Sequence, residues 1–242
     1  MSRVNIYNVL FYLFIACALT SVYIQTADLP VKQFTSPITA GLVAVCAVIG
    51  IPGHRLKVRE GLILAAAWTL AACGDVFFEM SRLSKTPDDA GRFFIIAVAI
   101  FLVAYLIFGV SFSVIGIRAH LAKWKYAIAV AVAAIMGIIA YASLLVPAGQ
   151  NMLVIVYTAQ AVILLFGGLL CLMAGRYTFA CIGILLFFSD WLVGLRAFGN
   201  PAMVPEFVKV HILILILVTY YIPMAASVDY SLNRRDRATG PA

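Results

Sequence analysis

The amino-acid sequence predicts an all-α fold, a polytopic membrane bundle of eight transmembrane helices. Three observations support this prediction. Hydrophobic residues make up 64% of the 242 residues, and the mean hydropathy is +1.07. Charged residues make up only 11%, whereas soluble domains have about a quarter. The apolar residues gather in eight runs, each close to the roughly 20 residues that a membrane-spanning helix needs.

The eight runs are joined by short connections that contain Pro, Gly and charged residues, which interrupt helices. The first run follows Arg3 as in a signal peptide, but it is long enough to span and is interpreted as a retained helix. The second is short, and Pro37 opens it. We expect one domain over 1–232 and a short basic cytoplasmic tail over 233–242. The predicted helices are 6–25, 34–51, 61–80, 93–117, 124–145, 151–174, 177–198 and 206–230.

The distribution of Lys and Arg predicts the orientation, because cytoplasmic loops carry the excess of these residues. One side would hold 11 of the 17, namely Arg3, Arg55, Lys57, Arg59, Arg118, Lys123, Lys125, Arg176, Arg234, Arg235 and Arg237. The other would hold Lys32, Arg82, Lys85, Arg92, Arg196 and Lys209. We therefore expect both termini in the cytoplasm of a multi-pass protein, in a bacterial inner membrane. The net charge of +7 favours contact of the cytoplasmic loops with anionic lipid headgroups and not with nucleic acid.

Several kinds of site are not expected from this sequence. All five cysteines fall within apolar runs without a CxxC motif, so we expect small buried residues and neither disulfides nor a metal site. The sequence contains no GxSxG, HExxH or Gly-rich phosphate loop, and no cofactor is required by the chemistry expected below. The sequence leaves the oligomeric state open.

Two carboxylates inside apolar runs are the strongest functional signal. An ionised Asp at the bilayer centre costs roughly 2.5–3.5 kcal/mol even on insertion scales, yet Asp75 and Asp190 each lie within a predicted helix. Both helices run outward in the expected topology, so both side chains lie toward the non-cytoplasmic end. Two carboxylates in one poorly hydrated site do not both ionise easily, which leaves one acid and one base. We predict that Asp75 and Asp190 are catalytic; a structural pair, each bonded to Arg or backbone, is the alternative.

Other polar residues are predicted to lie at this depth and to bind substrate. Glu79 and Arg82 follow Asp75 at i+4 and i+7 on one helix face. The alternative for Glu79 and Arg82 is that they only mark the end of the helix. For Arg196 the alternative is a side chain that snorkels to the membrane interface, and for His211 it is a hydrogen-bonded packing residue. The predicted substrate-binding residues are Glu79, Arg82, Tyr157, Arg196, His211, Tyr220 and Tyr221, and Gln160 shares the depth of Tyr157.

A weak internal repeat accompanies these residues. Asp75 and Asp190 are 115 positions apart, as are Tyr105 and Tyr220. A duplication would give two four-helix halves with the same orientation, and coincidence is the alternative.

At these residues the chain resembles the YhhN family of integral membrane lysoplasmalogenases. The matching motifs are Gly74-Asp75, Phe187-Phe188-Ser189-Asp190 and Thr219-Tyr220-Tyr221, with Tyr157 as a further family-like residue. The chain departs from the family in the fourth helix, where the family usually has a Phe and a His one turn apart. Here Gly116 follows Phe112 at that spacing, and Met224 and Ala225 stand where the family usually has a Gln.

The resemblance implies hydrolysis of the vinyl ether bond of a lysoplasmalogen, a lysophospholipid within the bilayer. The products would be a fatty aldehyde and glycerophosphoethanolamine or glycerophosphocholine. One Asp would protonate the alkenyl carbon and the other would activate water, and the sequence leaves their order open. Arg82, Arg196 or Lys209 would hold the phosphate. No metal and no organic cofactor is implied.

Two other functions use the same pair of aspartates. An intramembrane aspartyl protease is the first, although Ala72 stands where the first Gly of its GxGD signature belongs. A proton-coupled transporter of lipids or small molecules, with Asp75 and Asp190 as a relay, is the second.

Overall fold

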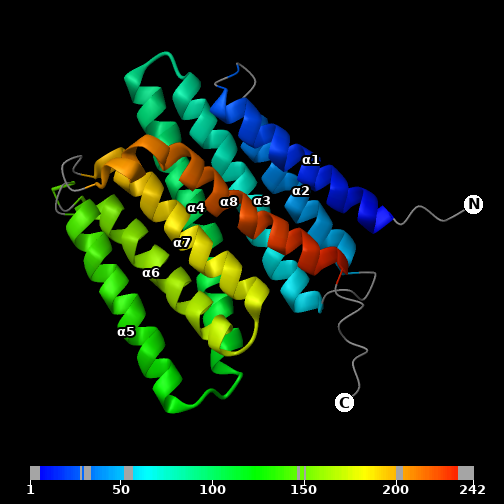
Figure 1. The fold of residues 1–242 in the computed structure, drawn as a ribbon. Coiled ribbons are helices and arrows are strands. Elements are labelled where there is room, and N and C mark those ends of the chain that lie inside the picture. The colour runs from blue at the N-terminus through cyan, green and yellow to red at the C-terminus, as the bar shows by residue number, and fades with distance from the viewer. Residues whose placement is uncertain are drawn as a thin grey trace, which may run out of the picture. The chain divides into compact units, whose positions relative to one another are not determined.

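The computed structural model describes residues 6–27, 29, 34–51, 57–145, 148–149, 151–199 and 204–233. These residues form eight helices, which Figure 1 follows along the chain. A short π-helical segment, η2, continues the fifth helix. The bounds are α1 Ile6–Thr26, α2 Thr35–Gly50, α3 Val58–Leu83, α4 Pro87–Ile117, α5 Lys123–Ala140, η2 Tyr141–Leu145, α6 Met152–Met173, α7 Tyr177–Phe198 and α8 Glu206–Asn233.

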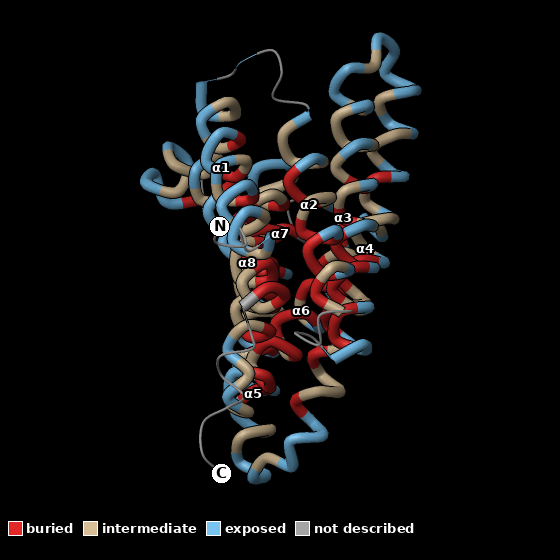
Figure 2. Tube along the Cα trace, turned by 90° about the vertical axis from the view of Figure 1, so that its right-hand side faces the viewer, coloured by how far each residue is buried: buried red, intermediate tan, exposed pale blue. Residues whose placement is uncertain are grey.

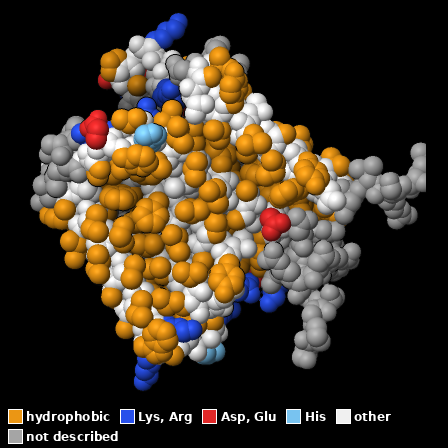
Figure 3. Space-filling view, viewed as in Figure 1, with side chains coloured by type: hydrophobic (Ala, Val, Ile, Leu, Met, Phe, Trp, Pro, Cys, Tyr) orange, Lys and Arg blue, Asp and Glu red, His pale blue; other side chains and the backbone are white. Residues whose placement is uncertain are grey.

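The predicted eight-helix, all-α fold is confirmed, and seven of the described helices are long and apolar enough to cross a membrane. The exception is α2, whose 16 residues rise roughly 24 Å, less than the roughly 30 Å of a hydrocarbon core. Hydrophobic side chains cover most of the face shown in Figure 3, with charged side chains mainly near its edges. The chain is a multi-pass membrane protein.

The helices divide into two compact units, each described here by itself. The first consists of residues 1–104 and 224–242, and the second of residues 105–223. The boundaries fall inside α4 and α8, so the units are not the two halves that the 115-residue repeat would give. The predicted tail lies outside the described residues from position 234 onward.

In the first unit, α2 runs antiparallel to α1 and packs against α3. Ser21 hydrogen-bonds Thr39 with 3.1 Å between the two hydroxyl oxygens, and the Gln25 amide donates to Ser36 Oγ at 2.8 Å. The end of α1 therefore lies beside the start of α2. The last part of α8 packs on α3, where Trp68 Nε1 donates to Ser227 Oγ at 3.0 Å and the Tyr230 hydroxyl donates to Glu60 Oε2 at 2.7 Å.

In the second unit, α6 packs closely against both α4 and α7 because glycines face it. A Cβ on Gly116 of α4 would lie 2.4 Å from Leu170 Cβ, and one on Gly167 would lie 2.7 Å from the carbonyl oxygen of Gly109. Buried residues follow α6 and α7 in Figure 2, and half or more of their most apolar windows is buried. Small residues at helix crossings bring backbones close enough for such packing in a membrane.

Candidate functional site

A tight turn sets α6 and α7 side by side in opposite directions. Gly175, with a φ of 70°, ends α6 in the left-handed region, where glycine avoids the steric cost of a Cβ. The Arg176 amide donates back to the Cys171 carbonyl at 2.8 Å, which closes the turn. At Gly183, seven residues after Arg176, the backbones of α6 and α7 almost touch, since a Cβ on Gly183 would lie 2.8 Å from Gly168 Cα.

This close contact fixes the register that positions Asp190. Asp190 comes seven residues after Gly183, and in an antiparallel pair it lies level with Ala161, seven residues before Gly168. Asp190 is only 4% exposed. Two side chains of α6, Tyr157 and Gln160, interact with its carboxyl group. They are three residues apart, so they share one face of the helix.

The polar groups around Asp190 are close but incompletely bonded. Neither the amide nitrogen nor the carbonyl oxygen of Gln160, which is 2% exposed, has a partner at full hydrogen-bond geometry within the described chain. The same holds for Asp190 Oδ2. A buried polar atom without a partner costs about 1–3 kcal/mol, so this arrangement is unusual for a purely structural contact. A polar ligand or water would complete it.

Apolar and aromatic side chains pack along the same stretch of α6 and α7. Ala161 and Leu165 of α6 form a buried cluster with Phe187 of α7. Trp191, next to Asp190, donates from Nε1 to Ser143 Oγ of η2 at 3.0 Å. Irregular π-helical turns often occur at functional sites, and here η2 holds the residue that follows Asp190.

Asp75 belongs to the first unit. It is half-buried on α3, directly after Gly74, where a Cβ would lie 2.9 Å from the Phe101 ring. Its predicted neighbours on the same face, Glu79 and Arg82, form an ion pair with 3.0 Å between Oε1 and Nη1. Because Asp75 and Asp190 lie in different units, their pairing stays a prediction.

The remaining predicted site residues have other local contacts. Arg196 is exposed in the last turn of α7. His211 Nδ1 lies 2.8 Å from the carbonyl oxygen of Phe207, and its ring packs on the Phe207 ring with 4.5 Å between centroids. Tyr220 and Tyr221 are both buried, with their rings edge to face at 5.9 Å.

At position 116 the chain has Gly where the family that it resembles usually has His, and in this protein Gly116 packs against a neighbouring helix. With Leu170 2.4 Å from any added Cβ, α4 has no room there for a histidine side chain. Phe112, one turn earlier, is fully buried between the rings of Phe108 and Phe179. This part of α4 contributes packing to the second unit.

Two residues were not among the predicted site residues. Gln160 could have been included, because it follows Tyr157 by three positions in an apolar helix at the same depth. Glu60 is 8% exposed in the first turn of α3 and accepts the hydrogen bond from Tyr230. Its place in the sequence, beside basic residues of a connection, gave no sign of burial. Among the described residues, no group of three or more His, Cys, Asp or Glu side chains could hold a metal ion.

Comparison with known proteins identifies one family. The model of the YhhN family matches residues 31–225, which is most of the chain and includes Asp75, Tyr157 and Asp190. No curated protein and no solved structure matches the sequence.

Proposed function

Because the chain belongs to the YhhN family, we propose that it is a membrane hydrolase that cleaves the vinyl ether bond of lysoplasmalogens. The products are a fatty aldehyde and glycerophosphoethanolamine or glycerophosphocholine. The observation that supports this most is Asp190, a buried carboxyl group. One of its oxygens, and the Gln160 amide beside it, have no partner at full hydrogen-bond geometry among the described residues. Such a preorganised and incomplete polar site inside hydrocarbon suits a substrate that is itself a lipid.

The proposed reaction adds one water molecule across the bond. A protonated carboxyl group donates its proton to the alkenyl carbon remote from the ether oxygen, which leaves an oxocarbenium ion. A second carboxylate removes a proton from water as the water oxygen attacks the carbon bonded to the ether oxygen. The resulting hemiacetal breaks its bond to the glycerol oxygen, and aldehyde and alcohol leave. Proton transfer from a positioned acid contributes typically about 10²–10⁴-fold.

We assign the acid role to Asp190 and the base role to Asp75. Asp190 is withdrawn from water, and ionising a carboxyl group without water is costly, so it suits the role of proton donor. Asp75 is only half-buried, which leaves it access to the water that the reaction consumes. In this proposal Tyr157 and Gln160 hold the Asp190 carboxyl group in place and offer hydrogen bonds to the ether oxygen.

The test is release of aldehyde from a lysoplasmalogen by the purified full-length protein in detergent, followed through aldehyde reduction coupled to NADH oxidation. We expect Asp190→Asn and Asp75→Asn each to lower kcat by about 10²–10⁴-fold. Asp88→Asn is the matched control, because Asp88 is exposed in the first turn of α4. It should leave the rate unchanged.

The outcomes separate the candidate functions. Equal aldehyde release by wild type and Asp190→Asn would overturn the hydrolase proposal. Full activity of Asp75→Asn alone would overturn the paired mechanism. Lipid transport in proteoliposomes without any aldehyde would favour the transporter alternative.

A further inference from the structure

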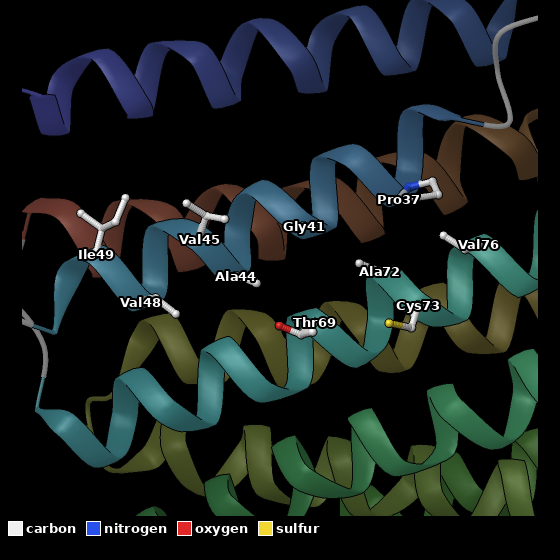
Figure 4. A pocket seen from close by; sticks show the side chains of 10 residues that line it. All are labelled: Pro37, Gly41, Ala44, Val45, Val48, Ile49, Thr69, Ala72, Cys73 and Val76. Atoms are coloured by element: carbon white, nitrogen blue, oxygen red, sulfur yellow. The ribbon is translucent and has the colours of Figure 1, made fainter.

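An apolar groove of about 480 Å³ runs between α2 and α3 within the first unit. Its two sides face each other in Figure 4, with Ala44 and Val48 on α2 and Thr69 and Ala72 on α3. Gly41, Ala44 and Ala72 are small lining residues, and they leave space between the two helices. At Gly41, in particular, an added Cβ would meet no atom within 4 Å. Since α3 is long and apolar enough to cross the membrane, we expect the groove to lie at the depth of lipid chains.

The dimensions of the groove fit one aliphatic chain. On α2 it extends from Pro37 to Ile49, which at 1.5 Å per residue is roughly 18 Å. One leaflet of a bilayer core is about half of the roughly 30 Å total. Several lining side chains, including Val45, Val48 and Val76, are about half exposed, so a chain could enter sideways from the membrane.

The line of residues that forms the α3 side of the groove leads to a pair of opposite charges. Thr69, Ala72 and Val76 follow helical spacing, and Glu79 is the next residue on that face. Glu79 is bonded to Arg82 at 3.0 Å, and their side chains are 18% and 48% exposed. A phospholipid headgroup with a phosphate and an ammonium group is complementary to such a pair, with phosphate on Arg82 and ammonium on Glu79.

We propose that the α2–α3 groove binds the single aliphatic chain of a zwitterionic lysophospholipid, whose headgroup lies at Glu79 and Arg82. The inference rests on the proposed function in one respect, because a lysoplasmalogen belongs to this lipid class. The groove would be the place where the aliphatic chain binds, and its lining residues would select a lipid with one chain. Asp75 lies between Val76 and Gly74 on the same helix, one turn before Glu79, so the bound headgroup would be next to a predicted catalytic residue.

The direct test is photo-crosslinking with a lysophosphatidylcholine whose acyl chain carries a diazirine. This probe has no vinyl ether bond, so labelling does not depend on turnover. We expect labelled peptides from residues 37–49 and 69–76 of the wild-type protein. Unlabelled lysophosphatidylcholine should compete, whereas glycerophosphocholine, which lacks the chain, and a diacyl phosphatidylcholine should not. Even labelling of all membrane-facing helices, or equal competition by the diacyl lipid, would overturn the inference.

A pair of glycine variants gives an independent readout. Gly41→Leu fills the groove without a backbone clash, and Gly91→Leu is its control on α4, where an added Cβ also meets nothing within 4 Å. A few methylene groups change binding to an apolar pocket by about tenfold or more. We therefore expect Gly41→Leu to lose competed labelling and to raise KM by about tenfold with kcat unchanged, and Gly91→Leu to behave as wild type.

Failure of this inference differs from failure of the proposed function. Competed labelling of the groove in a protein that releases no aldehyde would support the groove and overturn the hydrolase. Aldehyde release with unspecific labelling, and with KM unchanged by Gly41→Leu, would overturn the groove alone. Asp190→Asn should retain groove labelling in either case, because Asp190 is not among the residues that line the groove.

Discussion

At the scale of residues, Gln160 is the clearest conflict between stability and function. Its side chain is almost fully buried, and both amide atoms lack a partner at full hydrogen-bond geometry within the described residues. Natural proteins keep such costs mostly at functional sites. In the proposed site the cost is offset when substrate binds beside Asp190.

Gln160→Leu tests this interpretation because it replaces the two amide atoms, which lack a partner at full hydrogen-bond geometry among the described residues, with apolar atoms of similar size. We expect the variant to be more stable by about 1 kcal/mol, since the desolvation cost is removed, but at least tenfold less active, at the low end of general acid–base contributions of about 10²–10⁴-fold. Thermal unfolding in detergent and aldehyde release are the measurements.

Gln25→Leu is the control for this experiment. Gln25 donates to Thr35 Oγ1 and Ser36 Oγ at 3.1 Å and 2.8 Å, so its replacement should lower stability. A Gln160→Leu protein that is less stable and fully active would assign Gln160 a structural role.

At the scale of elements, glycines hold α6 between α4 and α7. The contacts at Gly116, Gly167 and Gly183 leave no space for a Cβ. Since the register of α6 against α7 positions Asp190 relative to Tyr157 and Gln160, these glycines act on the site through packing.

Gly116→Ala is expected to destabilise the protein by about 1–3 kcal/mol, as overpacking usually does. The methyl group would lie 2.4 Å from Leu170 Cβ, and the backbone of Leu170 is only 3.0 Å away. The helices must therefore separate. A lower unfolding temperature in detergent is the measurement.

Gly137→Ala in α5 is the matched substitution. Its Cβ would meet Val162 Cγ2 at 3.4 Å, an ordinary contact, and Ala is favoured over Gly in a helix by roughly 0.5–1 kcal/mol. We expect an unchanged or raised unfolding temperature. Equal effects of the two substitutions would contradict the packing role of Gly116.

At the scale of the whole molecule, the short helix α2 determines the topology. Its 16 residues run antiparallel to α1 and pack along α3, as a crossing helix would. With eight crossings the two termini lie on one side, as the distribution of Lys and Arg predicts. With seven they would lie on opposite sides.

Single cysteines in the connections measure this topology. In a background with all five native cysteines replaced by Ala, Ser84→Cys is expected to react with a membrane-impermeant maleimide from outside intact cells. Lys123→Cys should react only after the cells are opened. A cysteine added at the N-terminus should behave like Lys123→Cys if α2 crosses, and its labelling from outside would show that α2 does not cross.

Much of the fold could be predicted from the sequence because the membrane imposes a simple rule. Every backbone polar group in hydrocarbon must be bonded within the segment, so each apolar run of sufficient length forms a helix. The bounds of α7, Tyr177–Phe198, agree with the prediction. Missed features arise from contacts between helices: the π-helical turn η2 after α5, and the close approach of Gly116 to Leu170.

The candidate site divides in the same way. Asp190 was recognisable from the sequence because an acidic residue inside an apolar run has a known cost. Its neighbours were only partly recognisable. Tyr157 was predicted to bind substrate, whereas Gln160 was predicted only to share its depth, and the buried Glu60 was not anticipated.

The sequence by itself determined the membrane class, the eight helices and the two costly aspartates, since these follow from the transfer of single residues and short runs from water to hydrocarbon. Only the tertiary structure decided that Tyr157 and Gln160 face Asp190 and that a groove lies between α2 and α3. These features depend on contacts between helices, such as the glycine contacts that set the register of α6 against α7, and no single segment carries that information.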